Sequence, residues 1–393
     1  MSSIEAPIER IRPLTGAFTV LHVGFVLTGI VTTLLGPILP TLITRWSLSD
    51  SGAGLFFTLQ FCGNLAGVAS LGALLSWRGY RLTFFLGFAF VFLGIAFLLP
   101  VGKLAGMVST AFFGYGLGLV LSATNLWVAE VAASRRAAAL SLLNLAWGIG
   151  AIACPALVVF AQKENQLSTL LFGVAGFAGL LALILAAIEI EPRTRESDTP
   201  KTRDAQAMQG TRIPAALGGL FFLYVGTEAS VGGWIAALAK RITTMPGALW
   251  ALAPMFFWAG LLTGRALAPL VLARISEATL VTSGLILAAI GTGGLLWVTT
   301  FRGSAICVAA SGLGLSCVYP LLIAWMVGNY GERARRIGSV MFALASLGGA
   351  TMPWLVGFTS MRAGNLRTGL LVPLAGCLIM MSLLLPLRRH SAS

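Results

Sequence analysis

The sequence has 393 residues, of which 57% are hydrophobic and only 10% charged, and its mean hydropathy is +0.91. Soluble globular domains are about 25% charged, so this composition excludes an ordinary soluble enzyme and a disordered protein. The net charge of +13 lies mostly between long apolar runs, which is typical of membrane topology rather than of nucleic-acid binding. The sequence therefore predicts an all-α protein embedded in membrane lipid, with no nucleic-acid partner.

Long apolar runs predict twelve transmembrane helices, each near the ~20 residues that cross about 30 Å of hydrocarbon. They are expected at 14–44, 51–76, 82–100, 104–132, 136–161, 168–190, 213–240, 247–273, 277–298, 302–329, 334–361 and 367–388. Residues 191–212 interrupt the series with nine charges and two prolines, as a solvated linker does. We therefore expect an N-terminal six-helix bundle over 1–190, a cytoplasmic linker over 191–212 and a C-terminal six-helix bundle over 213–393.

The basic residues predict the orientation of the chain. With the N-terminus inside, the inside loops hold 17 Lys and Arg residues and the outside loops hold 8. Basic loops stay preferentially on the cytoplasmic side. Both termini are therefore expected in the cytoplasm, and a bacterial inner membrane is the expected location.

An internal repeat relates the two halves. A shift of 197 or 198 residues aligns Gly29 with Gly226, Gly63 with Gly260, Gly67 with Gly264, Gly114 with Gly312, Gly116 with Gly314, Arg135 with Arg333, Gly150 with Gly348, and Pro155 with Pro353. Two six-helix pseudo-repeats in parallel place a cavity between them near the bilayer midplane. Rocking of one half against the other would expose that cavity to each side in turn.

Twelve spans, a polar central linker and a half-length repeat resemble the major facilitator superfamily. Residues 72–81 (GALLSWRGYR) are similar to its signature G-x-L-A-D-R-x-G-R-K, with Ser76 in place of the Asp. Residues 224–234 (YVGTEASVGGW) and 258–265 (WAGLLTGR) resemble more specifically the fucose-permease-like sugar:proton symporter branch. The branch carries acids in spans one and four, near Gly36 and Leu121 here, and neither residue is acidic. The resemblance implies a monomer whose spans one, four, seven and ten line the cavity.

Glu228 is the only carboxylate well inside an expected span, close to the midplane. A charge there costs about 2.5–3.5 kcal/mol on insertion scales, and protonation removes that cost, so the residue suits a proton carrier. A hydrogen bond to a substrate hydroxyl is the other functional role it suits. The structural alternatives are a partner for Arg265 and support for a backbone break at Gly232-Gly233. Arg265, the only intramembrane cation, lies roughly 9 Å from Glu228 in depth. It either pairs with Glu228, binds a substrate anion or bonds backbone carbonyls.

Other polar and aromatic side chains complete the candidate site. His22 in span one is a second candidate for proton coupling, because its imidazole titrates near neutral pH, although it also suits packing. Sugar sites stack aromatic rings on the sugar and place amides on its hydroxyls. The candidate substrate-binding residues are Gln60, Asn64, Asn125, Asn144, Trp147, Tyr224, Glu228, Trp234, Trp258, Arg265 and Tyr319.

These features predict a secondary active transporter, most simply a proton-coupled symporter of a sugar or related small polar solute. Alternatives are an organic-anion transporter anchored by Arg265, a multidrug/proton antiporter, and a membrane receptor or scaffold that moves nothing. The sequence contains no P-loop, G-x-S-x-G, H-E-x-x-H or C-x-x-C motif, so neither an enzyme, a metal site nor a cofactor is predicted. The expected partners are a small-molecule substrate and protons.

Overall fold

The computed structural model describes residues 12–100, 102–132, 135–190, 212–243, 247–330 and 334–390. Within these ranges the regular structure is helical and contains no strand. The helices are α1 (Arg12–Thr33), α2 (Leu35–Trp46), α3 (Asp50–Ala96), α4 (Lys103–Val131), α5 (Arg136–Lys163), α6 (Leu167–Ala187), α7 (Arg212–Ile242), η3 (Leu249–Leu252), α8 (Ala253–Leu272), α9 (Glu277–Gly294), α10 (Phe301–Leu315), α11 (Val318–Tyr330), α12 (Ala334–Ala363), α13 (Leu366–Gly369) and α14 (Leu371–His390). The prediction of an all-α chain is confirmed for these residues.

Eleven helical stretches of the described chain are long and apolar enough to cross a membrane. One of them, α3, has 47 residues and is divided by Gly79, whose φ of 71° and ψ of −166° are not helical. Counting the two arms of α3 separately gives the twelve expected spans. The expected loop between 76 and 82 is therefore reduced to a turn at a single glycine.

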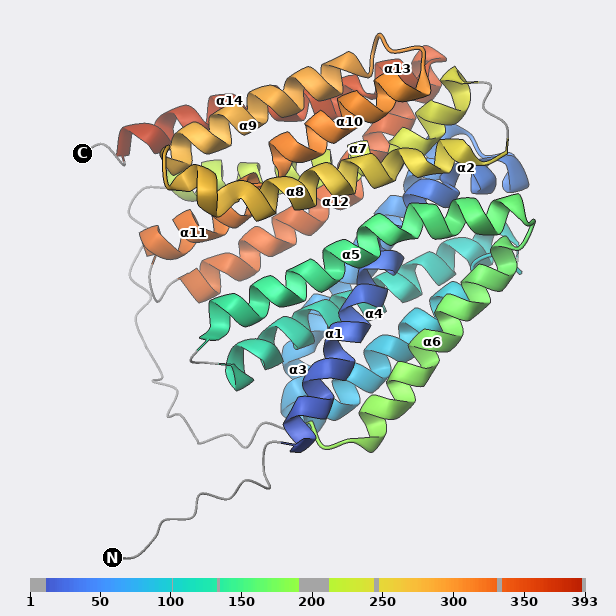
Figure 1. Cartoon of the computed structure of the whole chain (residues 1–393), viewed down its shortest axis with the longest axis vertical. Helices are drawn as coiled ribbons and strands as arrows, with labels where there is room; N and C mark the ends of the chain where they lie inside the picture. The colour runs from blue at the N-terminus through green and yellow to red at the C-terminus, as the bar shows by residue number, and fades with distance from the viewer. Residues whose placement is uncertain are drawn as a thin grey trace, which may run out of the picture.

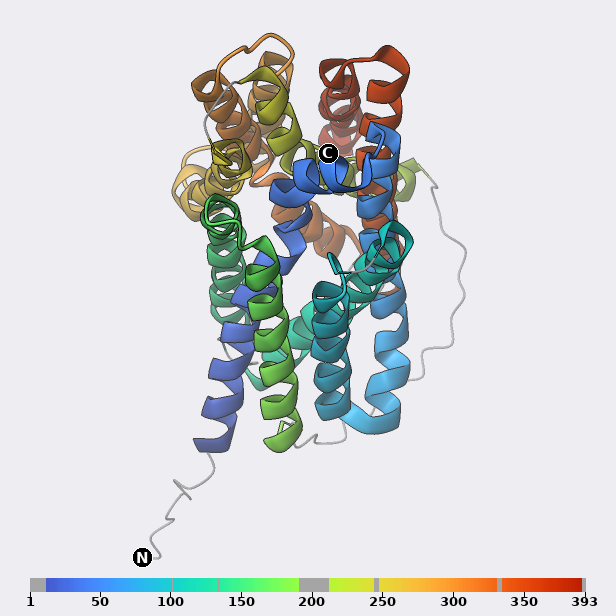
Figure 2. The same ribbon diagram turned by 90° about the vertical axis from the view of Figure 1, so that its right-hand side faces the viewer.

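The helices form two groups (Figure 1): α1–α6 make one half of the molecule and α7–α14 the other. We call them the N-half and the C-half. The expected linker, apart from Arg212, lies outside the described residues. We call the end of the bundle where α6 stops and α7 starts the linker end, and the opposite end, where α2 and α7 stop and α3 starts, the far end. In both views α2 lies beside helices of the C-half at the far end (Figures 1 and 2).

Equivalent glycines let helices cross in close contact in the two halves. A Cβ on Gly150 of α5 would collide with the carbonyl oxygen of Val26 on α1, and one on Gly348 of α12 would collide with that of Phe222 on α7. In each of the other aligned pairs, the two glycines lie against equivalent helices of their own halves. These pairs are Gly29 and Gly226, Gly63 and Gly260, Gly67 and Gly264, Gly114 and Gly312, and Gly116 and Gly314. The two pseudo-repeats are thus confirmed at the level of backbone contacts. Arg333 of the aligned pair Arg135/Arg333 lies outside the described residues.

Two expected spans are broken well away from their ends, and each break lies three or four residues before a proline. Span 14–44 divides at Leu34 into α1 and α2, and span 302–329 divides at Ser316 and Cys317 into α10 and α11. Proline has no N–H to donate to the carbonyl four residues before it. Pro37 therefore leaves the carbonyl of Thr33 without its helical donor, and Pro320 does the same to Ser316.

The turn at Gly79 gives a test of the fold. Replacing Gly79 by Ala should lower the free energy of unfolding by on the order of 1–3 kcal/mol, because residues with a Cβ avoid this backbone conformation. Gly72→Ala is the matched control: it is an exposed helical glycine with open space where the Cβ would go. It should be neutral or slightly stabilising. Thermal unfolding of the purified protein in detergent measures both changes, and equal midpoints for the two variants would contradict this account of the turn.

Candidate functional site

Glu228 lies midway along α7, one turn after Tyr224. Because residues four apart share a face of a helix, the two side chains meet, and the Tyr224 hydroxyl donates to Oε1 of Glu228 at 3.2 Å. The Glu228 side chain is only 16% exposed, so its charge lies in a poorly solvated place. Such a carboxylate needs a counter-charge or a proton.

Arg265 of α8 supplies the counter-charge. Its Nη2 lies 3.9 Å from Oε1 of Glu228, and the Arg265 side chain is 24% exposed. The same Nη2 lies 3.5 Å from the Tyr224 hydroxyl. The two charges that the sequence places at different depths are therefore in contact across α7 and α8. The distance is long for an Arg–carboxylate pair, which is commonly about 2.7–2.9 Å.

The break between α10 and α11 provides the third partner of Arg265. Its Nε donates to the carbonyl oxygen of Ser316 at 3.4 Å. This is the carbonyl that Pro320 leaves without a helical donor. It also lies at the C-terminal end of α10, where the helix dipole favours a cation. Ser316 was not among the residues predicted from the sequence, although the proline four residues later was a signal that could have indicated it.

Tyr319, just past the break, is the last member of the group around Glu228 and Arg265. Its ring stacks on that of Tyr224 with centroids 5.3 Å apart, and it makes an edge contact with Phe221 at 5.5 Å. We call Tyr224, Glu228, Arg265, Ser316 and Tyr319 the charged cluster. All five belong to the C-half. At the repeat offset of 197, the positions of Glu228 and Arg265 are occupied in the N-half by the apolar Val31 and Val68.

Two tryptophans make a contact between the halves. Trp147 on α5 makes an edge contact with Trp258 on α8, with ring centroids 5.5 Å apart. Trp258 and Arg265 are seven residues apart and therefore share a face of α8. The indole N–H of Trp258 is buried and has no hydrogen-bond partner. A buried donor without a partner is unusual, and this one lies two helical turns from Arg265 along α8.

The four predicted amides lie in the N-half, and the described contacts do not join them to the charged cluster. Gln60 donates to the carbonyl of Thr32 at 3.0 Å. Asn125 and Asn144 each donate to the carbonyl four residues earlier in their own helix, at 2.8 and 2.9 Å. Asn64 lies half-buried on α3, one turn after Gln60. The amide N–H groups of Gln60, Asn125 and Asn144 are thus engaged with backbone.

Trp234 and His22 also lie apart from the charged cluster. Trp234 is fully buried, and its indole N–H donates to the carbonyl of Pro353 at 2.9 Å, on the far-end side of α7. His22 on α1 has Nδ1 within 2.7 Å of the Phe18 carbonyl, its ring lies against Phe18, and its Nε2 is buried without a partner. The indole of Trp234 is thus tied to α12, whereas one ring nitrogen of His22 has no partner.

The absent acid at position 36 has a structural reason. A Cβ on Gly36 of α2 would lie 2.8 Å from the carbonyl oxygen of Gly232 on α7. A contact this close leaves no room for a side chain, so the branch's first acid could not be accommodated here in this conformation. The glycine instead lets the backbones of α2 and α7 approach one another at the boundary between the halves.

Comparison with known proteins identifies the family. The family model described as Major Facilitator Superfamily matches residues 21–353. The chain belongs to the Major Facilitator Superfamily. It is thus a multi-pass integral membrane protein and a transporter rather than an enzyme. No curated protein matches the sequence.

Solved structures share the fold at low sequence identity. A D-xylose–proton symporter superposes with a TM-score of 0.78 at 17% identity, covering 95% of this chain and 97% of that one. A point variant of the E. coli fucose:proton symporter gives 0.63 at 17% identity, covering 95% and 98%. The human organic anion transporter MFSD10 gives 0.65 at 17% identity, covering 96% and 100%. These likenesses extend over nearly the whole chain and establish its fold.

The ion pair gives a stability prediction. Arg265→Gln should destabilise the protein, because it leaves the Glu228 carboxylate without its counter-charge. Breaking a fully buried pair costs about 3–5 kcal/mol, and partial exposure of both side chains makes the cost here smaller. The double variant Glu228→Gln/Arg265→Gln should recover much of the loss, since no unpaired charge remains.

The thermal unfolding midpoint in detergent measures both variants. Arg274→Gln is the matched control, because Arg274 is an exposed arginine just beyond the end of α8. Its midpoint should equal that of the wild type. A double variant that is less stable than Arg265→Gln alone would contradict the pairing.

Proposed function

We propose that this transporter is a proton-coupled symporter that works by alternating access and carries a sugar or a related small polar solute. The observation that carries this proposal is Glu228, a carboxylate midway along a membrane-spanning helix that contacts one arginine and one tyrosine. The charged cluster is the site at which proton and solute act on each other. Trp147, Trp258 and the free indole N–H of Trp258 are assigned to the solute.

Protonation of Glu228 is the coupling event. While Glu228 is ionised, Arg265 is held between two acceptors on different helices, the carboxylate of α7 and the Ser316 carbonyl of α10. A proton on the carboxylate removes one of these attractions. Arg265 is then free to move with the α10–α11 break or to bind a solute. One proton moving down 100 mV supplies about 2.3 kcal/mol, which supports a gradient of about fiftyfold.

Aromatic rings and hydrogen-bonding groups support a sugar-like solute. The apolar face of a sugar ring stacks on aromatic side chains, and its hydroxyls need donors and acceptors. Tyr319 and Trp147 are half-buried and lie on opposite halves. The D-xylose and fucose symporters are similar to this chain in fold. This similarity supports the proposal that this transporter also carries a sugar-like solute.

The orientation and state of assembly belong to the same proposal. We infer that both termini face the cytoplasm of a bacterial cell, since 17 of the basic residues then lie in inside loops. The far end then faces outward. The transporter acts as a monomer, with membrane lipid around it.

Glu228→Gln tests the coupling. In proteoliposomes with an imposed pH gradient, this variant should no longer accumulate a solute that the wild type concentrates, because glutamine carries no titrating proton. It should still exchange labelled for unlabelled solute when no gradient is present. Glu130→Gln, which removes an exposed acid near the end of α4, is the control and should accumulate solute normally.

Accumulation by Glu228→Gln equal to that of the wild type would end the coupling role. Binding without any flux in the wild type would identify a receptor and end the transport proposal itself.

A second candidate, proton-coupled transport of an organic anion, is favoured by the loose coordination of Arg265. Its three contacts, at 3.4, 3.5 and 3.9 Å, are all longer than a good charged hydrogen bond. A substrate carboxylate could therefore replace Glu228 as the partner of Arg265 once Glu228 is protonated. The proton and the anion would then enter together.

A thermal-shift screen separates the two solute classes, because a ligand that binds the folded state raises its unfolding temperature. Sugars, polyols and small carboxylates should be screened at two pH values. For an anion transporter, carboxylates stabilise the wild type more at the lower pH and lose this effect in Arg265→Lys, because lysine lacks the bidentate donor geometry. Stabilisation by sugars in both proteins would instead support the symporter of neutral solutes.

A further inference from the structure

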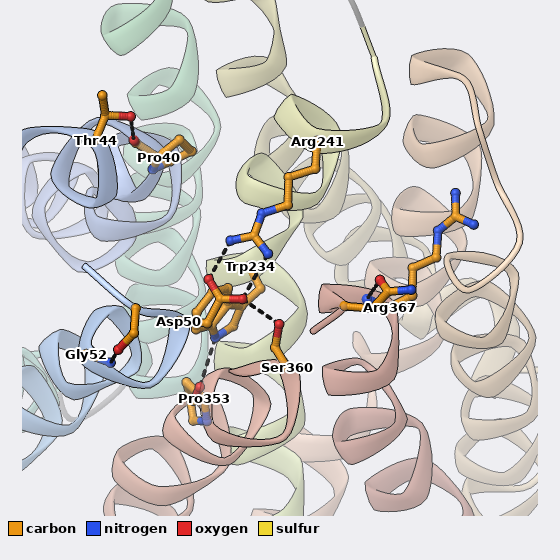
Figure 3. Close-up of polar contacts among 11 residues, drawn as sticks. Pro40, Thr44, Asp50, Gly52, Trp234, Arg241, Pro353, Ser360 and Arg367 are labelled. Atoms are coloured by element: carbon orange, nitrogen blue, oxygen red, sulfur yellow. Dashed lines mark hydrogen bonds and ion pairs between the residues drawn. The ribbon is translucent and has the colours of Figure 1, made fainter. Parts of the chain in front are cut away.

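A second ion pair lies at the far end, where it joins the two halves. Asp50, the first residue of α3 in the N-half, accepts two hydrogen bonds from the guanidinium of Arg241, near the end of α7 in the C-half. The contact between Nη1 and Oδ2 measures 2.8 Å. Ser360 of α12, also in the C-half, donates to Oδ2 of the same carboxylate. Figure 3 shows Arg241 and Ser360 converging on Asp50 from two different helices.

The geometry makes this a strong contact. Arg241 binds both carboxylate oxygens, which is the favoured bidentate arrangement of an arginine and a carboxylate. The Asp50 side chain is only 13% exposed, whereas that of Arg241 is 38% exposed. Asp50 is thus largely removed from water by the C-half. If the halves separated at this end, both charges would have to be hydrated again.

The helices beside this ion pair are packed too closely for water to separate them. A Cβ on Gly54 of α3 would lie 2.8 Å from the Cα of Trp354 on α12. Further along α3, the hydroxyl of Thr58 donates to the carbonyl of Ala350 on α12 at 2.6 Å. Lys240, next to Arg241, donates to the hydroxyl of Thr44 on α2 at 3.2 Å. The far end is therefore closed by contacts between the halves.

We propose that Asp50, Arg241 and Ser360 form the latch of the transport cycle: their contacts hold the far end closed and must break each time the solute site opens there. Alternating access requires the two halves to separate at each end in turn. The bonds of Asp50 to Arg241 and Ser360 exist only while the far end is closed, so they stabilise that conformation alone. The latch therefore sets the population of the two conformations.

The neighbouring charges fit this assignment. Lys240 also lies 5.2 Å from the ring centre of Trp250, so it is held by its own partners and does not compete for Asp50. Arg367 lies at the same end of the C-half, but it donates to the carbonyl of Val298 within its own half, at 2.8 Å. In Figure 3 the side chain of Arg367 points away from Asp50. Arg367 is therefore a matched control for Arg241.

Distances between spin labels test the latch in the full-length protein. Labels are placed at Lys103→Cys in the N-half and Arg302→Cys in the C-half, two exposed residues at the start of α4 and α10 at the far end. Cys62 and Cys307, which are exposed and half-buried, are first replaced by alanine. The measurement needs neither a substrate nor a proton gradient, so its outcome is independent of the function proposed for the charged cluster.

Loss of the latch should favour the open far end. Asp50→Asn and Arg241→Gln should each raise the ratio of long to short label distances by about tenfold relative to the wild type. Ser360→Ala removes one neutral donor and should shift the ratio in the same direction by a smaller factor. Arg367→Gln should leave it unchanged. The charge-exchanged variant Asp50→Arg/Arg241→Asp should return toward the wild-type ratio, since the Ser360 hydroxyl can accept as well as donate.

Two results would overturn the latch. One is an unchanged ratio in Asp50→Asn, Arg241→Gln and Ser360→Ala, provided that each variant is purified as a monodisperse, helical protein. The other is a charge-exchanged variant whose ratio is no closer to that of the wild type than those of Asp50→Asn and Arg241→Gln. Ser360→Ala changes a single hydroxyl and keeps the test decisive if a charge variant fails to fold.

Discussion

The structure depends on how one positive charge is neutralised inside a membrane-spanning bundle. Arg265 is shared between the Glu228 carboxylate, the Tyr224 hydroxyl and the Ser316 carbonyl. Each partner lies on α7 or at the α10–α11 break, so the arginine links three helical segments of one half. A charge in hydrocarbon is tolerated only with such partners. The break at Ser316 and Cys317, the tyrosine stack and the position of Glu228 all serve this requirement.

Glycine determines how near the halves and their helices can come. Within each half, equivalent glycines place α1 against α5 and α7 against α12. Between the halves, Gly36 and Gly54 do the same at the far end. Backbones in contact gain dispersion energy over a large area and leave no room for lipid or water. The far-end closure is thus a packed interface with an ion pair at its edge.

The two ion pairs have different roles in the proposed transport cycle, because one lies within a half and the other lies between the halves. Glu228 and Arg265 lie in the same half, so rigid-body rocking of the halves leaves their contact intact, and in the proposed mechanism protonation breaks it. Asp50 and Arg241 lie on opposite halves, so the rocking itself breaks their contact. Under these proposals, a proton acts on the first pair and the conformational change acts on the second. For the two pairs to be coupled, binding of solute and proton must change the relative populations of the conformations that are open at the far end and at the linker end.

The sequence by itself determined the class of fold and much of its plan. Apolar run length predicted the spans, and the aligned glycines predicted the two halves, because both properties are local or periodic. It also singled out Glu228 and Arg265, since isolated charges in apolar runs are costly. Only the tertiary structure decided that these two side chains are in contact, that the Trp234 indole donates to the Pro353 carbonyl, and that Asp50 pairs with Arg241. Those contacts join residues far apart along the chain, and helix packing brings them together, which no local pattern encodes.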